Sequence, residues 1–384
     1  MKLLDEIHNL IARQTLDVKT EGGNYAYINA RLKSRSAKLL KPGDYETLLG
    51  MSVNEIGVKL GESQYGKELN ALGLQYKGVD LIEHALAAIL SKEMGDIYRF
   101  CQGGLREIVS RRLLLFDAEN LKAVLRARAN KVGADEVKRS LVPIEFSGVQ
   151  FNLAKWIDLH ATEDDAAFIK KLADTPFEKA LSYAWKSFSG SGTPDDVRKK
   201  RLILELEMID LFSYNLHIHA VTGNDEHSRL LKEIFSIEAD TINLHTFLML
   251  LLNELSAGDI VTRLLSGARF FTPDKLEKMA ALPSFHAAVA ELRKSQPYPE
   301  LDGPLETAEK TENLLPLDRE LKKLFMRKLD GKAQLYPLTA LTAISYIKHR
   351  WRECENIRII ARGKSLELPE PEIRELLLIV ARKS

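Results

Sequence analysis

The strongest candidate for chemistry in this sequence is a glycine-rich segment, Gly61-Glu-Ser-Gln-Tyr-Gly66-Lys67. Its spacing matches the first seven positions of a phosphate-binding loop, in which backbone N–H groups and a lysine hold the phosphates of a nucleotide. The eighth position is Glu68, so the hydroxyl that would bind magnesium is missing and a carboxylate would repel phosphate. The preceding residues 56–60 belong to a helix opened by Ser52, whereas such a loop follows a strand. We therefore expect a joint between two helices here.

Two histidines, His217 and His219, are the next candidates because imidazole is a common metal ligand. Residues two apart point about 200° apart on a helix, so these two rings cannot share a metal ion without a break in the helix. No pair of acidic residues is marked out as a general acid and base. The sequence therefore predicts no catalytic residue, no metal site and no cofactor site.

A repeated basic pattern is the clearest feature of the chain. It consists of an asparagine, a basic residue two positions later and, in most copies, an arginine four positions after that. The asparagines are about a hundred residues apart, which is too long for a short-repeat solenoid and suits a repeated small domain. The four copies are Asn29 with Arg31 and Arg35, Asn120 with Lys122 and Arg126, Asn243 with His245 and Met249, and Asn356 with Arg358 and Arg362.

The spacing of the basic residues predicts a shared surface. Residues four apart lie on one helix face, where like charges destabilise an isolated helix by roughly a few tenths of a kcal/mol. A recurrent pair therefore suggests an acidic partner, and the candidate interface residues are Arg31, Arg35, Lys122, Arg126, Arg358 and Arg362. The alternative is a solvated face whose cations form salt bridges within the chain.

An acidic residue precedes three of the asparagines by three positions. These acids are Asp117, Asp240 and Glu353. We expect them in the first turn of a helix, where a negative charge complements the helix dipole. The three asparagines would then lie at equivalent helix starts.

The elements that carry these residues are predicted to be helices. Apolar residues recur with helical spacing almost throughout, for example over residues 3–11 and 373–380. Ser52 opens a capping box with Glu55, and Thr175-Pro176 marks another helix start. No run of alternating β-branched residues is bounded by hairpin turns. The sequence therefore predicts an all-α protein.

Composition narrows the class of protein further. The 384 residues are 45% hydrophobic and 28% charged, with a net charge of +1, so no global field drives binding to nucleic acid or membrane. Cys101 and Cys354 are isolated, which suits a reducing compartment. Asp5 and Glu6 argue against a signal peptide, and the longest strongly apolar run, residues 246–252, is too short to span a membrane.

The repeats predict the domain organisation. Leucine-containing breaks follow three of the asparagines, at Leu40, Leu141 and Leu265. We expect one helical unit used about three times, with a final half-unit that repeats only its opening helix. The expected boundaries are 1–23 for an N-terminal helix, 24–116, 117–239 and 240–352 for three helical repeats, and 353–384 for the C-terminal half-unit.

Three segments of the chain resemble the C subunit of the archaeal-type (A/V-type) rotary ATPase, which is the relative of the d subunit of the eukaryotic vacuolar ATPase. They are Tyr25-Ala-Tyr-Ile-Asn29-Ala-Arg31, Asp44-Tyr-Glu-Thr-Leu-Leu49 and the stretch from Tyr346 to Lys364. The most specific part is Glu353-x-x-Asn356-Ile-Arg358. The similarity covers nearly the whole chain and is weakest in the middle third, where His245 and Met249 stand in place of arginines.

The resemblance implies a funnel of three similar helical domains that sits on the membrane proteolipid ring and grips the end of the rotating central shaft. Such a central-stalk protein performs no chemistry and transmits torque between the soluble head and the rotor in ion transport, for instance of protons. Its partners would be the shaft subunits and the ring, with no nucleic acid and no small-molecule substrate. It would be cytoplasmic and peripheral to the membrane as part of the complex.

Two other interpretations stay open from the residues alone. One is a helical-repeat adaptor whose basic faces bind nucleic acid or another acidic partner, although no interleaved aromatic residues accompany the basic helix over residues 31–41. The other is an enzyme with an unrecognised all-α site. A steep salt dependence of binding to DNA or RNA would favour the adaptor.

Overall fold

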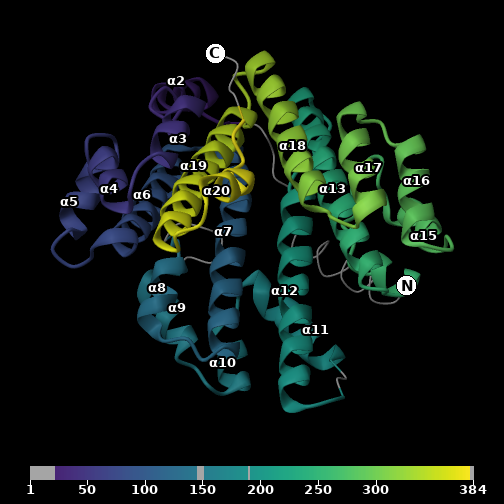
Figure 1. Ribbon diagram of the computed structural model, residues 1–384. Coiled ribbons are helices and arrows are strands. Elements are labelled where there is room, and N and C mark those ends of the chain that lie inside the picture. Colours follow the sequence, from purple (N-terminus) through teal and green to yellow (C-terminus); the bar gives the residue numbers. More distant parts are fainter. Residues whose placement is uncertain (1–21, 145–150, 189–190, 381–384) are drawn as a thin grey trace. The chain divides into compact units, whose positions relative to one another are not determined.

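The computed structural model describes residues 22–144, 151–188 and 191–380, and the regular elements within them are all helical (Figure 1). The predicted all-α class is confirmed for this part of the chain. The helix expected over residues 1–23 lies almost wholly outside the described residues. The chain divides into two compact units, which we call the larger unit (Gly22–Leu206 with Tyr336–Ser384) and the smaller unit (Glu207–Leu335).

The larger unit is built around three long helices, α6 (Gly78–Phe100), α7 (Gly103–Ala129) and α19 (Leu341–Ser365). The shorter helices of this unit are α2 (Tyr25–Ser36), α3 (Pro42–Leu49), α4 (Val53–Gly61), α5 (Gly66–Leu72), α8 (Ala134–Ser140), α9 (Leu153–His160), α10 (Asp165–Lys171), α11 (Pro176–Ser187) and α20 (Glu370–Leu376). Helix α19 packs against α6, α2 and α3, so segments from both ends of the described sequence meet here (Figure 1). The boundary between the units falls within α12 (Pro194–Ile218).

The smaller unit pairs two long helices, α13 (Glu226–Leu252) and α18 (Leu315–Leu335), which pack against each other. The remaining elements are α14 (Ala257–Val261), α15 (Pro273–Ala280), α16 (Phe285–Ser295), the 3-10 helix η1 (Pro299–Leu301) and α17 (Asp302–Thr311). Their apolar faces form one core in which Phe247, Phe271 and Leu324 are fully buried.

Helix α13 is long and apolar enough to span a membrane, judged by length and composition alone. Within the smaller unit, 67% of its most apolar stretch is buried. Burial in a protein core accounts for this apolar composition, because a core helix needs the same residues as a spanning one.

Several helices begin where the sequence predicts. Ser52 caps α4 by accepting from the backbone N–H of Glu55, whose side chain accepts from the backbone N–H of Ser52 in return. Thr272 caps α15 with a single bond, accepting from the backbone N–H of Lys275. Helix α11 also starts at Pro176 as predicted, but the hydroxyl of Thr175 donates to the carbonyl of Leu172 instead of capping the helix.

Candidate functional site

Three of the four repeated asparagines make the same pair of hydrogen bonds. Each side-chain amide donates to the backbone carbonyl, and accepts from the backbone N–H, of the residue 22 positions later. The pairs are Asn120 with Val142 (2.9 and 2.7 Å), Asn243 with Leu265 (2.9 and 2.7 Å) and Asn356 with Leu378 (3.0 and 3.1 Å). All three asparagines are buried. An amide side chain presents an N–H donor and a carbonyl acceptor side by side, as a peptide group does, so it can satisfy both the N–H and the C=O of one backbone residue.

The position of these asparagines corrects the prediction of helix starts, which is wrong. Asn120, Asn243 and Asn356 lie inside α7, α13 and α19, and each is followed by nine further helical residues. Asparagine is disfavoured inside helices because its amide competes for nearby backbone groups. Here the amide bonds to a segment outside its own helix, which removes that competition. Asn29 differs, since its Oδ1 is buried without a hydrogen-bond partner among the described residues.

The acids before the asparagines are buried as well. They lie far inside α7, α13 and α19, so their expected place in a first helical turn is also wrong. Asp240 accepts hydrogen bonds from the backbone N–H groups of Phe270 and Phe271, both at 2.8 Å, and from the Tyr298 hydroxyl at 3.2 Å. Burial raises the pKa of the Asp240 carboxyl, and the two backbone donors oppose that rise. Phe271 lies two residues before Pro273, the first residue of α15.

Glu353 repeats this arrangement with partners from the other end of the chain. It accepts from the backbone N–H of Leu40 at 2.5 Å and from the hydroxyl of Tyr65. Leu40 lies two residues before Pro42, the first residue of α3, as Phe271 precedes α15. The carboxylate of α19 therefore holds the residues that lead into a short helix near the start of the sequence.

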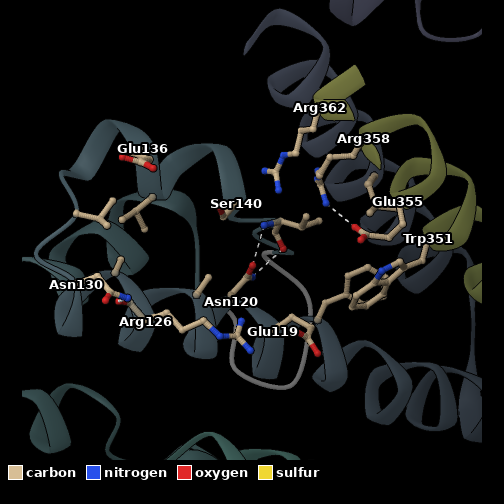
Figure 2. A pocket seen from close by; sticks show the side chains of 17 residues that line it. Glu119, Asn120, Arg126, Asn130, Glu136, Ser140, Trp351, Glu355, Arg358 and Arg362 are labelled. Atoms are coloured by element: carbon tan, nitrogen blue, oxygen red, sulfur yellow. Dashed lines mark hydrogen bonds and ion pairs between the residues drawn. The ribbon is translucent and has the colours of Figure 1, made fainter. Parts of the chain in front are cut away.

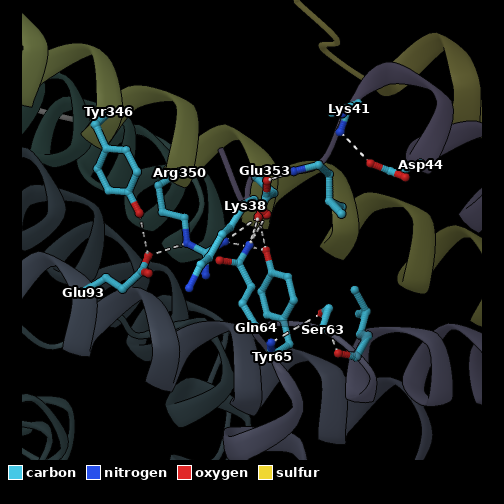
Figure 3. Close-up of polar contacts among 12 residues, drawn as sticks. Lys38, Lys41, Asp44, Ser63, Gln64, Tyr65, Glu93, Tyr346, Arg350 and Glu353 are labelled. Carbon is cyan, nitrogen blue, oxygen red and sulfur yellow. Dashed lines mark hydrogen bonds and ion pairs between the residues drawn. The ribbon is translucent and has the colours of Figure 1, made fainter. Parts of the chain in front are cut away.

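Glu353 belongs to a buried polar cluster centred on Arg350 (Figure 3). The Arg350 side chain is fully buried, its Nε lies 2.5 Å from a Glu93 carboxylate oxygen, and its Nη1 donates to the Tyr65 hydroxyl at 2.7 Å. Nη1 also pairs with Glu353. Burial and the Glu353 charge both raise the pKa of Tyr65. Sequence reasoning missed this cluster, although Arg350 and Glu353 share one helical face in the segment that carries the family resemblance.

The first basic pair, Arg31 and Arg35, is bound within the chain. The Arg31 guanidinium lies 3.9 Å from the centroid of the Phe100 ring, and it donates to the Tyr27 hydroxyl at 2.7 Å. Arg35 forms an ion pair with Asp96 at 3.1 Å. These two residues of α2 therefore brace the C-terminal end of α6.

The second and fourth pairs are placed differently. Lys122 is buried and pairs with Glu119 at 2.7 Å, whereas Arg126, one turn further along α7, is exposed. On α19, Arg358 pairs with Glu355 at 2.5 Å, and Arg362 pairs with Glu83. Arg358 is 12% exposed and Arg362 is 51% exposed.

A cavity of about 370 Å³ in the larger unit brings three of the six basic residues together (Figure 2). Arg358 and Arg362 enter it from α19, and Arg126 enters it from α7. The Arg31, Arg35 and Lys122 side chains do not line it. Three of the six predicted interface residues thus converge on a cavity, where Arg358 and Arg362 also pair with acids of the chain, and the other three lie away from it.

The third copy of the pattern carries no cation pair. His245 lies 3.8 Å from Asp318, and burial lowers its imidazole pKa. Met249, at the position of the missing arginine, is exposed. The smaller unit therefore lacks the basic face found on α7 and α19.

The glycine-rich near-match is a helix joint, as predicted. Gly61 ends α4 and Gly66 begins α5, and a Cβ on Gly66 would lie 2.2 Å from the Gly61 carbonyl oxygen. That close approach explains the glycine without a phosphate. Glu68 pairs with Lys92 at 3.2 Å.

The two histidines belong to the smaller unit and have separate partners. His217 is buried 3.3 Å from Glu238, and His219 lies 2.8 Å from the Ser266 hydroxyl. Among the described residues, no group of three or more histidine, cysteine and acidic side chains is placed to hold a metal ion.

Taken together, the fold and site define an all-α protein with a recurring asparagine clamp on its long helices and a cavity lined by arginines. A sequence model of the family described as ATP synthase (C/AC39) subunit matches residues 28–376. The chain belongs to this family.

Relatives named as the C subunit of A-type ATP synthase are similar to this chain along almost its full length. The chain is 27% identical to the A-type ATP synthase C subunit of Methanococcoides burtonii over 96% of this chain and 98% of the relative. It is 29% identical to the protein of the same name from Haloferax volcanii, over 94% and 99% of the two chains. It is 26% identical to the A-type ATP synthase C subunit of Methanosarcina acetivorans, over 99% of this chain and 100% of the relative.

Proposed function

We propose that this chain is a non-catalytic central-stalk subunit of a rotary A/V-type ATPase, and that it couples the rotating shaft of the soluble head to the membrane proteolipid ring. The observation that carries the proposal is the family match over residues 28–376, with relatives named as the C subunit of A-type ATP synthase that align over nearly their whole length. The chain would then be cytoplasmic and peripheral to the membrane, held there by its partners.

The interior of the larger unit suits a protein that transmits torque. A coupling element must resist twisting, and densely packed helices joined by buried ion pairs deform little. The Arg350 cluster joins α19 to α6 and to the start of α5, and Asn356 fixes the segment after α19. These contacts stiffen the unit without creating a reactive group.

We also propose that the chain is built from three repeats, over 24–116, 117–239 and 240–352, arranged as a funnel around an axis. The equal 22-residue reach of Asn120, Asn243 and Asn356 supports the repetition. The bond from Leu40 to Glu353 suggests that the half-unit 353–384 completes the first repeat, because it supplies the acid that Asp240 supplies in the third repeat.

A binding experiment tests the coupling role. The purified chain would be mixed with shaft subunits of an A-type ATP synthase and with its detergent-solubilised proteolipid ring, and complexes would be separated by size and analysed by mass spectrometry. We expect shaft and ring to co-migrate only when the chain is present. Binding to neither partner, or shaft and ring joining equally well without the chain, would contradict the proposal.

A further inference from the structure

The cavity between α7 and α19 contains an arginine whose hydrogen-bonding capacity is largely unused. Arg358 is 12% exposed, and its Nη1 pairs with Glu355. Its Nε and Nη2 are buried and make no hydrogen bond with any residue that the structure describes. A buried charged donor without a partner is costly, so these atoms favour a ligand that accepts hydrogen bonds.

A second arginine in the cavity is available for the same ligand. Arg126 is exposed, lines the cavity from α7, and makes no ion pair with a described residue. Arg362 lines it from α19 and is half exposed while it pairs with Glu83. Figure 2 shows Arg358 and Arg362 extending toward the side of the cavity from which Arg126 enters.

The balance of charge around the cavity selects the kind of anion. Glu119 is neutralised by Lys122, Glu355 by Arg358, and Glu83 by Arg362. Among the described residues, Arg126 is then the lining cation without an acidic partner. Glu136, the lining acid besides Glu119 and Glu355, is exposed and makes no ion pair with a described residue. Because Glu136 offsets Arg126, the charges around the cavity balance, and the lining glutamates repel a singly charged carboxylate less than they repel a phosphate dianion.

The apolar part of the lining indicates what carries the carboxylate. Phe116 and Trp351 line the cavity with their ring centroids 3.9 Å apart, and Leu90 and Ala123 extend this apolar wall. A carboxylate at the end of a short methylene stem places its charge on the arginines and its stem on these side chains. A volume of about 370 Å³ has room for one such side chain.

We propose that this cavity receives a single acidic side chain, aspartate or glutamate, from a polypeptide partner. The inference rests on the proposed function, which makes that partner the central shaft. Arg126 and Arg358 hold the carboxylate, and the aromatic pair contacts its stem. The basic residues that contact the partner are thus gathered in this one cavity of the larger unit. The other three basic residues of the repeated pattern, Arg31, Arg35 and Lys122, stabilise the chain itself.

The test measures the affinity of the full-length chain for purified shaft subunits of an A-type ATP synthase. Arg126→Ala removes an exposed side chain, so folding is preserved, and Arg358→Lys keeps the charge but removes the planar fork. The matched control is Arg374→Ala, which removes an exposed arginine of the same unit that pairs with Glu46 outside the cavity. We expect each cavity variant to bind at least about tenfold more weakly, and the control to bind within about twofold of the unchanged chain.

Three results would overturn the inference. If the unchanged chain binds the shaft and both cavity variants bind equally well, the inference about the cavity is wrong and the proposed function stands. If the unchanged chain does not bind the shaft, the proposed function fails and the inference about the cavity fails with it. If inorganic phosphate displaces the shaft at concentrations where butyrate, a single carboxylate on a short methylene stem, does not at matched ionic strength, the cavity selects phosphate rather than a carboxylate.

Discussion

The backbone N–H of Leu40 donates a hydrogen bond to the carboxylate of Glu353, across 313 residues of sequence. In the smaller unit, Phe271 donates in the same way to Asp240, only 31 residues away. Both donors lie two residues before the proline that opens a short helix. The same local arrangement is therefore made once within a continuous segment and once by joining the early and late parts of the chain.

The asparagine clamp predicts a local loss of stability when its amide is removed. Asn243→Ala leaves the buried N–H and carbonyl of Leu265 without their partner, which we expect to cost about 1–3 kcal/mol. The measurement is hydrogen exchange at the Leu265 amide, which should become faster. Asn253→Ala is the control, because Asn253 is exposed at the end of the same helix. Equal exchange in the two variants would show that the clamp contributes nothing.

The Arg350 cluster predicts a larger effect from the loss of one charge. Glu353→Gln keeps the shape of the side chain but leaves fully buried Arg350 with only one carboxylate, Glu93. We expect a loss of about 3 kcal/mol in the free energy of unfolding, measured with urea. Adding Arg350→Met to this variant should recover part of that loss. The exposed Glu372→Gln serves as a control, and an equally small effect at both glutamates would contradict the account.

Asp240 predicts a pH dependence of stability in the smaller unit. Burial raises its pKa above 3.8, so between that value and the folded pKa the folded protein binds more protons than the unfolded chain. The contribution of Asp240 to the free energy of unfolding is therefore fully present at low pH, and it falls as the pH rises through that window. In Asp240→Asn this contribution disappears, so the difference in unfolding free energy between the two proteins should change with pH in that window. A constant difference would show that the carboxyl is not perturbed.

The glycine-rich joint predicts an absence of nucleotide hydrolysis. Gly66 is required by its approach to the Gly61 carbonyl, and Glu68 occupies the position where a magnesium-binding hydroxyl would stand. We expect the isolated chain to release no phosphate from ATP above the background of a heat-denatured sample, and Lys67→Ala to behave identically. Hydrolysis that is lost in Lys67→Ala would contradict this.

The pair on α2 predicts an effect on stability rather than on assembly. Arg35 binds Asp96, and Arg31 stacks on Phe100. Replacing both with glutamate should lower the melting temperature of the isolated chain by a few degrees, roughly what 1 kcal/mol produces in a domain of this size. Shaft binding below that temperature should change little. The opposite pattern, intact melting with lost binding, would place the interface on α2.

Part of this structure could be predicted from the sequence. The helical class follows from the spacing of apolar residues, and the start of α4 follows from Ser52 and Glu55. The repeated asparagines are visible as a pattern, because the same physical task requires the same side chain three times. Their partners could not be predicted, since Val142, Leu265 and Leu378 contribute backbone atoms that any residue supplies.

The division of the basic residues also lay beyond sequence reasoning. Lys122 and Arg126 stand one turn apart on α7, yet one is buried against Glu119 and the other is exposed at a cavity. The difference depends on what packs over each turn, and α19 approaches from a part of the chain more than two hundred residues away. The hydrogen bond from Leu40 to Glu353 could not be predicted either, because its two residues are 313 positions apart in the sequence.

The coupling role is tested most directly by ion transport in a reconstituted complex. Vesicles would be prepared with the complete A-type ATPase, with a complex that lacks this chain, and with that complex after the purified chain is added back. ATP hydrolysis and ion uptake would be measured in the same samples. We expect omission of the chain to abolish ATP-driven ion uptake while the soluble head continues to hydrolyse ATP, and we expect addition of the chain to restore uptake. Ion uptake that persists at the full rate without the chain would contradict the account.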